Sequence, residues 1–314
     1  MPEKHNGNSI LKAPSVLISG GSGMVGKYLT SALLDRGYKV SHLSRNTNQF
    51  GKVRVYRWNP EQGILDPLHL AGVDFIVHLT GVNLGEKAWT KKRKEEILKS
   101  RIEPAMLIHK VVRDNKIRIK SFISASGVTY YGSVTSDKIF CEDDPPSSDF
   151  GSRTCIEWEK AADAFEKDGI RTVKLRSAVV LAKESPALLK LMTPARFGFL
   201  ARIGSGRQFF PWIHIQDLCN IYIKAIEDNR MTGPYNAVSP QHTNLNTFIE
   251  MLSHSIGRPI APIGVPAIAL RAVYGEMADI VLKGSRISSE KIKNAGYEFE
   301  FADLHYAFHD ILRD

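Results

Sequence analysis

Cysteine is scarce in this chain, which has three among its 314 residues. Cys141, Cys155 and Cys219 stand far apart and have neither the spacing of a metal site nor that of a disulfide framework. We therefore predict no metal ion, and we expect a reducing compartment, the cytoplasm.

Long apolar runs are also missing. No segment approaches the roughly 18 uninterrupted apolar residues that a membrane-spanning helix needs, so we predict no membrane partner. The first fourteen residues, MPEKHNGNSILKAP, lack the apolar core of a signal peptide. We interpret residues 1–14 as a disordered polar lead-in.

Acidic residues are outnumbered, because 42 Lys and Arg face 33 Asp and Glu and leave a formal net charge of +9. Much of the local excess lies at 87–101, where Lys and Arg mix with Glu at helical spacing, as on a solvated helix face. No recognised nucleic-acid module accompanies this segment, so we predict no nucleic-acid partner. The surplus also suits an anionic cofactor or substrate.

The segment VLISGGSGMVG at 16–26 joins an apolar strand to glycines at 20, 23 and 26, and a helical pattern follows it. Gly20 lets the chain turn, Gly23 lets the backbone approach a pyrophosphate, and Gly26 lets the helix pack closely on the strand. The free N–H groups of the helix N-terminus attract an anion. The segment therefore predicts a dinucleotide-binding turn, the alternative being an ordinary structural turn.

Apolar runs alternate with helical segments, which is typical of a parallel sheet covered on both faces. The candidate strands are 15–19, 39–43, 52–57, 74–79, 120–125 and 171–176, and the candidate helices include 88–114 and 152–167. We predict the α/β class, with a doubly wound parallel sheet.

After Val180 the composition changes. A stretch rich in Gly, Pro and aromatics at 186–215 precedes a helix at 217–228, a strand at 234–237 and a mostly helical segment at 244–314. Within that segment, 268–277 and 302–312 have amphipathic spacing, a Pro-rich hinge lies at 257–266, and we find no catalytic constellation. We predict a dinucleotide-binding domain at 15–180, to which 212–240 returns, and a smaller, mainly helical substrate lobe at 181–314.

The motifs together resemble the extended short-chain dehydrogenase/reductase superfamily. They are the Gly20, Gly23 and Gly26 spacing, HLTGVN at 78–83, FISASGVTYYG at 122–132 and WIHIQDL at 212–218. The segments GSGRQFFPWIHIQDL, WTKKRKEEILKSRI and GEMADIVLKGSRISSEKIKNAGYEFEFADLHYAF resemble its atypical, sugar-epimerase-like family of NAD(P)-dependent oxidoreductases. That resemblance implies a Rossmann fold and a nicotinamide cofactor, but it supplies no substrate. The sequence leaves a monomer and a homodimer open.

The end of the second candidate strand bears on the choice between NADP and NAD. An NAD site places a carboxylate about twenty residues beyond the glycines, whereas SHLSRN at 41–46 contains none. Arg45 can grip a 2′-phosphate with two hydrogen bonds and Ser44 can add a donor, although Arg45 can also be a solvent-facing loop residue. We predict NADP rather than NAD. The other predicted cofactor-binding residues are Gly20, Gly21, Ser22, Gly23, Met24, Val25, Gly26, Leu79, Thr80, Gly81 and Arg101. The alternative for Arg101 is that it only caps a helix face and does not touch the cofactor.

In the superfamily, a Tyr-x-x-x-Lys pair, helped by a serine or threonine, moves the proton that accompanies hydride transfer. Ser126 matches the serine, and we predict that it donates a hydrogen bond to a substrate oxygen. At the positions of the pair the chain has Phe150 and Thr154, neither of which can do this chemistry. Tyr130 and Tyr131 are candidate replacements, because Ser126, Val128 and Tyr130 would share one side of an extended chain. Alternatively, Tyr131 only forms a structural turn with Gly132.

Cys155 is either a thiol in the site or, as we expect, a small buried residue. For the substrate we predict contacts from Arg207, Gln208, Trp212 and His214, and His214 can instead be a structural histidine. Arg176 either reaches a ligand at the end of its strand or pairs with a carboxylate.

Two functions remain open. One is an NADP-dependent oxidoreductase or epimerase that acts on a small molecule, such as a nucleotide sugar, without the usual pair. The other is a non-catalytic NADP-binding sensor or regulatory protein.

Overall fold

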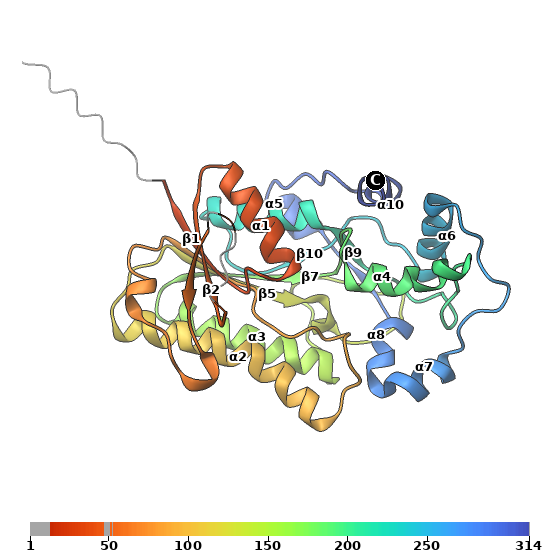
Figure 1. Cartoon of the computed structure of the whole chain (residues 1–314), viewed down its shortest axis with the longest axis horizontal. Coiled ribbons are helices and arrows are strands. Elements are labelled where there is room, and N and C mark those ends of the chain that lie inside the picture. The colour runs from red at the N-terminus through yellow and green to blue at the C-terminus, as the bar shows by residue number, and fades with distance from the viewer. Residues whose placement is uncertain (1–12, 47–50, 52, 314) are drawn as a thin grey trace, which may run out of the picture.

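The computed structural model describes residues 13–46, 51 and 53–313. Most of the expected lead-in therefore lies outside the described residues. Figure 1 shows a layered sheet-and-helix body on one side and a helical lobe on the other. No helix among the described residues is long and apolar enough to span a membrane.

A seven-stranded parallel sheet in the order β10-β7-β5-β4-β1-β2-β3 forms the centre of the body. This confirms the predicted doubly wound parallel sheet. All four residues of β4 are buried, as expected for a strand covered on both faces. The strands are β1 (Ser15–Ser19), β2 (Lys39–Ser44), β3 (Arg54–Arg57), β4 (Phe75–His78), β5 (Ser121–Gly127), β7 (Arg171–Ser177) and β10 (Gly233–Ala237).

Two pairs of helices cover the two faces of this sheet. The helices α1 (Met24–Asp35) and α5 (Ile215–Glu227) share one apolar core with the sheet, to which they contribute Leu29 and Ile221. The helices α2 (Lys91–Asp114) and α3 (Phe150–Lys167) contribute Ile108 and Phe165 to a second core on the opposite face. Figure 1 shows α1 and α5 above the sheet and α2 and α3 below it.

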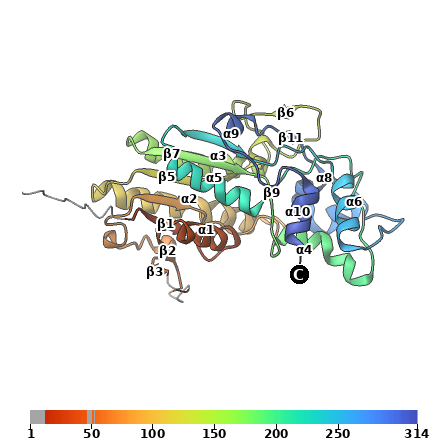
Figure 2. The ribbon, with the colours of Figure 1, turned by 90° about the horizontal axis from the view of Figure 1, so that it is seen from above.

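A third apolar core fills the helical lobe, where Phe248 and Phe308 pack with their ring centroids 5.1 Å apart. Two short parallel pairs complete the strands. The pair β8 (Val179–Leu181) with β9 (Trp212–His214) contributes Leu181 and Trp212 to this core, whereas β6 (Ile139–Phe140) with β11 (Arg286–Ile287) packs on the core shared with α1 and α5. Figure 2 shows the lobe from above. Its helices and those beside it are α4 (Pro186–Met192), α6 (Leu245–Ile256), α7 (Ala267–Tyr274), α8 (Asp279–Leu282), α9 (Glu290–Asn294) and α10 (Leu304–Ile311).

Short 3₁₀ turns connect several elements. They span Pro60–Gln62, Pro67–His69, Val128–Tyr131, Thr193–Phe197 and Gly275–Ala278. The turn after β5 corrects the expectation that Ser126, Val128 and Tyr130 share one side of an extended chain, because the strand ends at Gly127 and the backbone coils at once.

Candidate functional site

The glycine turn has the geometry of a phosphate cradle. Gly20 has φ +81°, and a Cβ there would lie 2.9 Å from the backbone nitrogen of Thr80. A Cβ on Gly26 would lie 2.6 Å from the carbonyl oxygen of Gly20. Gly23 precedes α1 without a side-chain cap, so the amides of the first helical turn stay available to an anion. The residues present therefore fit a dinucleotide pyrophosphate.

The ring of His42 lies beneath the turn. Gly21 packs on it so closely that a Cβ on Gly21 would lie 2.5 Å from the ring. Its Nε2 lies 2.8 Å from Oγ1 of Thr30 on α1, and burial lowers the pKa of the imidazole. Ser22 and Gly23 are exposed above it, and Met24 and Val25 are half-buried. The glycine turn thus packs on the buried His42 ring on one side and is open to solvent on the other.

The loop after β4 lies beside the turn and carries Leu79, Thr80 and Gly81. Arg101 supports this loop from below, because it donates to the carbonyl oxygens of Val82 at 2.9 Å and Ile97 at 3.0 Å. Its side chain is buried, which lowers its pKa to about 10, and its Cζ lies 4.9 Å from the centroid of the Trp158 ring. Arg101 therefore shapes the loop from the protein interior.

At the end of β2, Ser44 is half-buried and its hydroxyl accepts from the amide of Asn46 at 3.2 Å. Arg45 is exposed, with its Nη1 3.5 Å from Oε1 of Glu61. These two side chains lie at the same edge of the sheet as the glycine turn, as an adenosine ribose site requires.

Ser126, Arg176 and Asn236 occupy one row across the adjacent strands β5, β7 and β10. The Ser126 hydroxyl donates to Oε1 of Glu159 on α3 at 2.7 Å. Arg176 donates to both oxygens of the same carboxylate, at 2.8 and 2.9 Å. Because an ionised carboxylate only accepts, the Ser126 proton is directed at Glu159. This arrangement differs from the expected donation to a substrate oxygen.

Arg176 is thus held in a buried ion pair, the second of the two alternatives left open for it. Burial disfavours its charge, but the hydrogen bonds and the negative charge of Glu159 outweigh this effect and raise its pKa. It also donates to the hydroxyl of Tyr131 at 3.0 Å and to the carbonyl oxygen of Glu142 at 3.1 Å. The guanidinium is consequently fixed in one orientation.

The structure separates the two candidate tyrosines. Tyr131 is buried, its hydroxyl donates to Oδ1 of Asn236 at 2.7 Å, and burial raises its pKa. Tyr130 is half-buried, and the centroid of its ring lies 3.5 Å from Cζ of Arg176. Tyr131 therefore belongs to the interior network, whereas Tyr130 packs on the apolar core with its ring against the guanidinium of Arg176.

The positions of the missing pair are filled by inert groups. Phe150 is buried edge-to-face against Trp89, with the ring centroids 4.8 Å apart. Thr154 is buried and donates to the carbonyl oxygen of Phe150 at 2.8 Å. Cys155 is also buried, which raises the pKa of its thiol, and its Sγ lies 3.2 Å from Oγ1 of Thr129.

The four predicted substrate residues are not equally accessible. Arg207 is exposed. Gln208 and Trp212 are buried, and the Gln208 amide donates to the carbonyl oxygen of Val281 at 2.9 Å. His214 is buried and caps α5, since its Nδ1 accepts from the amide of Gln216 at 3.2 Å. Burial lowers the pKa of His214, although Asp310 and Asp217 oppose this shift.

Sequence reasoning missed Glu159, which joins Ser126 to Arg176. A signal was present, because Cys155, Trp158 and Ala162 repeat at helical spacing on the buried face of α3 and Glu159 falls on that face. A carboxylate on an apolar face needs a buried partner, and Arg176 on β7 was available.

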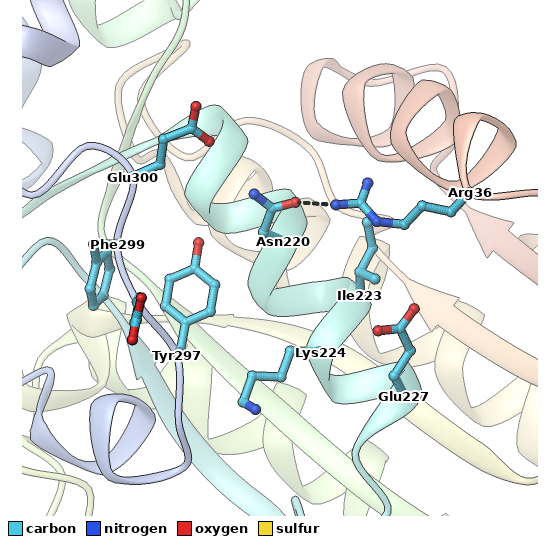
Figure 3. A pocket seen from close by; sticks show the side chains of 9 residues that line it. Arg36, Asn220, Ile223, Lys224, Glu227, Tyr297, Phe299 and Glu300 are labelled. Carbon is cyan, nitrogen blue, oxygen red and sulfur yellow. Dashed lines mark hydrogen bonds between the residues drawn. The ribbon is translucent and has the colours of Figure 1, made fainter.

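A surface groove of about 410 Å³ lies between α1, α5 and residues 297–300. Figure 3 shows that Arg36 reaches Asn220 across it, with Nη2 donating to Oδ1 at 3.0 Å. Arg36 caps the C-terminus of α1, so the groove lies at the other end of this helix from the glycine turn. Among the described residues, no group of three or more His, Cys, Asp or Glu is placed to hold a metal ion.

Comparison with known proteins agrees with this geometry. Residues 16–238 match the NAD dependent epimerase/dehydratase family, and residues 265–311 match a domain of unknown function, DUF1731. The epimerase family protein SDR39U1 of Mus musculus is 35% identical over 303 residues, which cover 95% of this chain and 99% of the mouse protein.

Two solved structures show the same fold. The crystal structure of the human epimerase family protein SDR39U1 (isoform 2) with NADPH has a TM-score of 0.83 and 31% identity, covering 95% of this chain and 98% of the human one. UDP-glucuronic acid 4-epimerase from Bacillus cereus, in complex with UDP-glucuronic acid and NAD, has a TM-score of 0.77 over 95% of this chain and 97% of its own. At 18% identity the latter is a likeness of fold alone.

Proposed function

Because the chain belongs to the NAD-dependent epimerase/dehydratase family, we propose that it is an NADP-dependent oxidoreductase or epimerase of a small molecule, such as a nucleotide sugar. Residues 15–180 with 212–240 form its cofactor-binding domain, and 181–314 form its substrate lobe. The placement of Tyr130 on the fixed guanidinium of Arg176 carries the proposal of chemistry.

The cofactor is held along the carboxyl edge of the sheet. The glycine turn binds the pyrophosphate through backbone amides, and Leu79, Thr80 and Gly81 line the adjoining loop. Ser44 and Arg45 bind the 2′-phosphate, in keeping with the NADPH in the human relative. A nicotinamide dinucleotide held there would supply the hydride chemistry.

Tyr130 takes the proton-transfer role that Phe150 and Thr154 cannot fill. A phenol that gives up its proton gains negative charge, and a fixed positive charge beside it stabilises that change. Arg176 is the cation beside Tyr130, with its Cζ 3.5 Å from the ring centroid, and it shares its charge with Glu159. The Ser126 hydroxyl donates its hydrogen bond to Glu159, so only its lone pairs are left for a ligand, and it accepts from a substrate hydroxyl. Arg207 is the exposed cation of the substrate lobe that meets an anionic group.

A turnover experiment tests this proposal. The purified chain is given NADPH with a panel of carbonyl compounds and NADP with the matching alcohols and nucleotide sugars, and the absorbance of NADPH is followed. We expect Tyr130→Phe to lower kcat by about 100-fold or more, the usual range for a lost acid–base group, with little change in the Kd of NADPH. The control is Tyr306→Phe, which changes an exposed tyrosine of α10. An undiminished kcat in Tyr130→Phe contradicts the role.

The second candidate function is an NADP-binding sensor without turnover. The buried Phe150 and Thr154 in place of the catalytic pair favour it. Tight NADPH binding together with no turnover of any panel member would support the sensor and contradict the enzyme.

A further inference from the structure

Two opposite charges meet where β2 and β3 end. Ser44 and Arg57 are paired in register, and the amide of Trp58 donates to the carbonyl oxygen of Ser44 at 3.2 Å. Arg45 follows the first of these strands. Glu61 lies in the 3₁₀ turn that follows the second, and Arg45 Nη1 lies 3.5 Å from its Oε1.

The turn that carries Glu61 is well anchored, whereas the side chains are free to move. Asn59 caps the turn by accepting from the amide of Gln62 at 3.2 Å. Asn59 and Ile64 exchange two backbone hydrogen bonds of 2.8 and 2.9 Å, and Gly63 adopts φ +66°. The side chains of Arg45 and Glu61 are 70% and 75% exposed, so their ion pair is weak and opens readily.

The pair presents both kinds of group that distinguish the two cofactors. A carboxylate binds the 2′-hydroxyl of an NAD ribose, whereas an arginine accommodates the 2′-phosphate of NADP. A 2′-phosphate gripped by Arg45 competes with Glu61 for the guanidinium and is repelled by the charge of Glu61. A ribose with a free 2′-hydroxyl meets no such repulsion and gains an acceptor.

We propose that Glu61 sets the preference of this chain between NADPH and NADH, by competing with the 2′-phosphate for Arg45 and by accepting from the 2′-hydroxyl of NADH. The inference rests on the NADP site proposed above. Arg45 alone would favour NADPH, and Glu61 reduces that preference. Glu61 is then a determinant of cofactor specificity.

Binding of the two cofactors tests this role without any substrate. The Kd values of NADPH and NADH are measured from dinucleotide fluorescence for the wild type and Glu61→Gln at low ionic strength. We expect NADPH to bind about threefold more tightly to Glu61→Gln, the size of a weak exposed ion pair, and NADH to bind no more tightly than before. Added salt should shrink the gain. The control, Glu290→Gln, removes a comparable exposed carboxylate that lies 2.9 Å from Lys293, and should change neither Kd.

Arg45→Ala and the double variant separate the possible failures. If Arg45→Ala weakens NADPH binding but Glu61→Gln leaves the NADPH-to-NADH ratio unchanged, the role of Glu61 is wrong and the NADP site stands. If Arg45→Ala leaves NADPH binding unchanged, both are wrong. Glu61→Gln should lose its effect on NADPH when Arg45 is already Ala, and an undiminished effect there would show that Glu61 acts through general charge alone.

Discussion

His78 shows how one buried side chain couples the cofactor edge to pH. Its Nδ1 lies 2.7 Å from the Ser19 hydroxyl and its Nε2 lies 3.0 Å from the carbonyl oxygen of Arg101. Since a carbonyl only accepts, Nε2 carries the proton and the neutral ring takes both bonds. Burial lowers its pKa to about 4, so the ring stays uncharged at neutral pH.

This shift predicts a loss of stability in acid. Unfolded His78 takes up a proton below its ordinary pKa of 6.5, whereas the folded protein does so only below about 4. Above pH 6.5, His78 therefore costs the folded protein no stability. As the pH falls from 6.5 toward 4, the free energy of unfolding drops by up to about 1.4 kcal/mol per pH unit.

Urea titrations at several pH values between 7.5 and 4.5 measure this loss. The variant His78→Gln should have a lower free energy of unfolding at pH 7.5. That free energy should also fall less steeply with decreasing pH, because up to one proton fewer is taken up on unfolding. The control His305→Gln removes an exposed histidine of α10 and should leave the slope as it is in the wild type. An equal slope in His78→Gln and the wild type would contradict the assignment.

Between elements, two ion pairs join β7 to α3 across their buried interface. Arg176 binds Glu159, and one helical turn further along Lys174 binds Asp163 with Nζ–Oδ1 2.5 Å. The side chains of Arg176 and Glu159 are only 3% and 8% exposed. Removing one charge of such a pair leaves the other without compensation in the interior.

Glu159→Gln is therefore expected to lower the free energy of unfolding by about 3 kcal/mol, at the low end for a broken buried pair because the amide keeps one acceptor. Chemical denaturation measures this change. The control Glu157→Gln breaks the exposed pair with Lys160 on the same helix and should cost under about 0.5 kcal/mol. Equal free energies of unfolding for the two variants would show that the buried Arg176–Glu159 pair does not stabilise the fold more than an exposed pair does.

The strands of the central sheet were predictable because apolar runs mark them, and β1 agrees at both ends with its expected range. The short strands β6, β8, β9 and β11 were not among the candidates. The helix starts depended on caps. The side chain of Asp149 accepts from the amide of Ser152, so α3 begins at Phe150 rather than at 152. The helix expected at 268–277 ends at Tyr274, because Gly275 adopts φ +56°.

The site was less predictable than the elements. The glycine turn is local in sequence, so its spacing carries its geometry. Ser126, Glu159 and Arg176 meet only through strand register and helix packing, and their pairing depends on side chains far apart in the chain. For the same reason, the sequence could not show which of Tyr130 and Tyr131 lies on the guanidinium.

At the scale of the whole molecule, the C-terminal segment crosses back over α5 and bonds to it. Asp217 is fully buried, and its Oδ1 accepts from the hydroxyl of Tyr297 at 2.6 Å and the amide of Glu300 at 2.9 Å. Its Oδ2 accepts from the amide of Phe301 at 3.0 Å. The chain then continues into α10, whose Phe308 fills the core of the helical lobe. The Asp217 carboxylate thus ties the segment before α10 to α5, together with Gln241, which bonds to Asp303 and Leu304.

Asp217→Asn should release this crossing more than it unfolds the sheet. The amide group of Asn would face the Phe301 amide, a donor against a donor, and leave it unsatisfied at a cost of about 2 kcal/mol. We expect faster limited proteolysis within 297–301, while NADPH binding at the far end of α1 persists. The control Glu298→Gln alters an exposed carboxylate in the same segment. Equal cleavage rates in the two variants would mean that the lobe is held by its apolar core, with Asp217 contributing little.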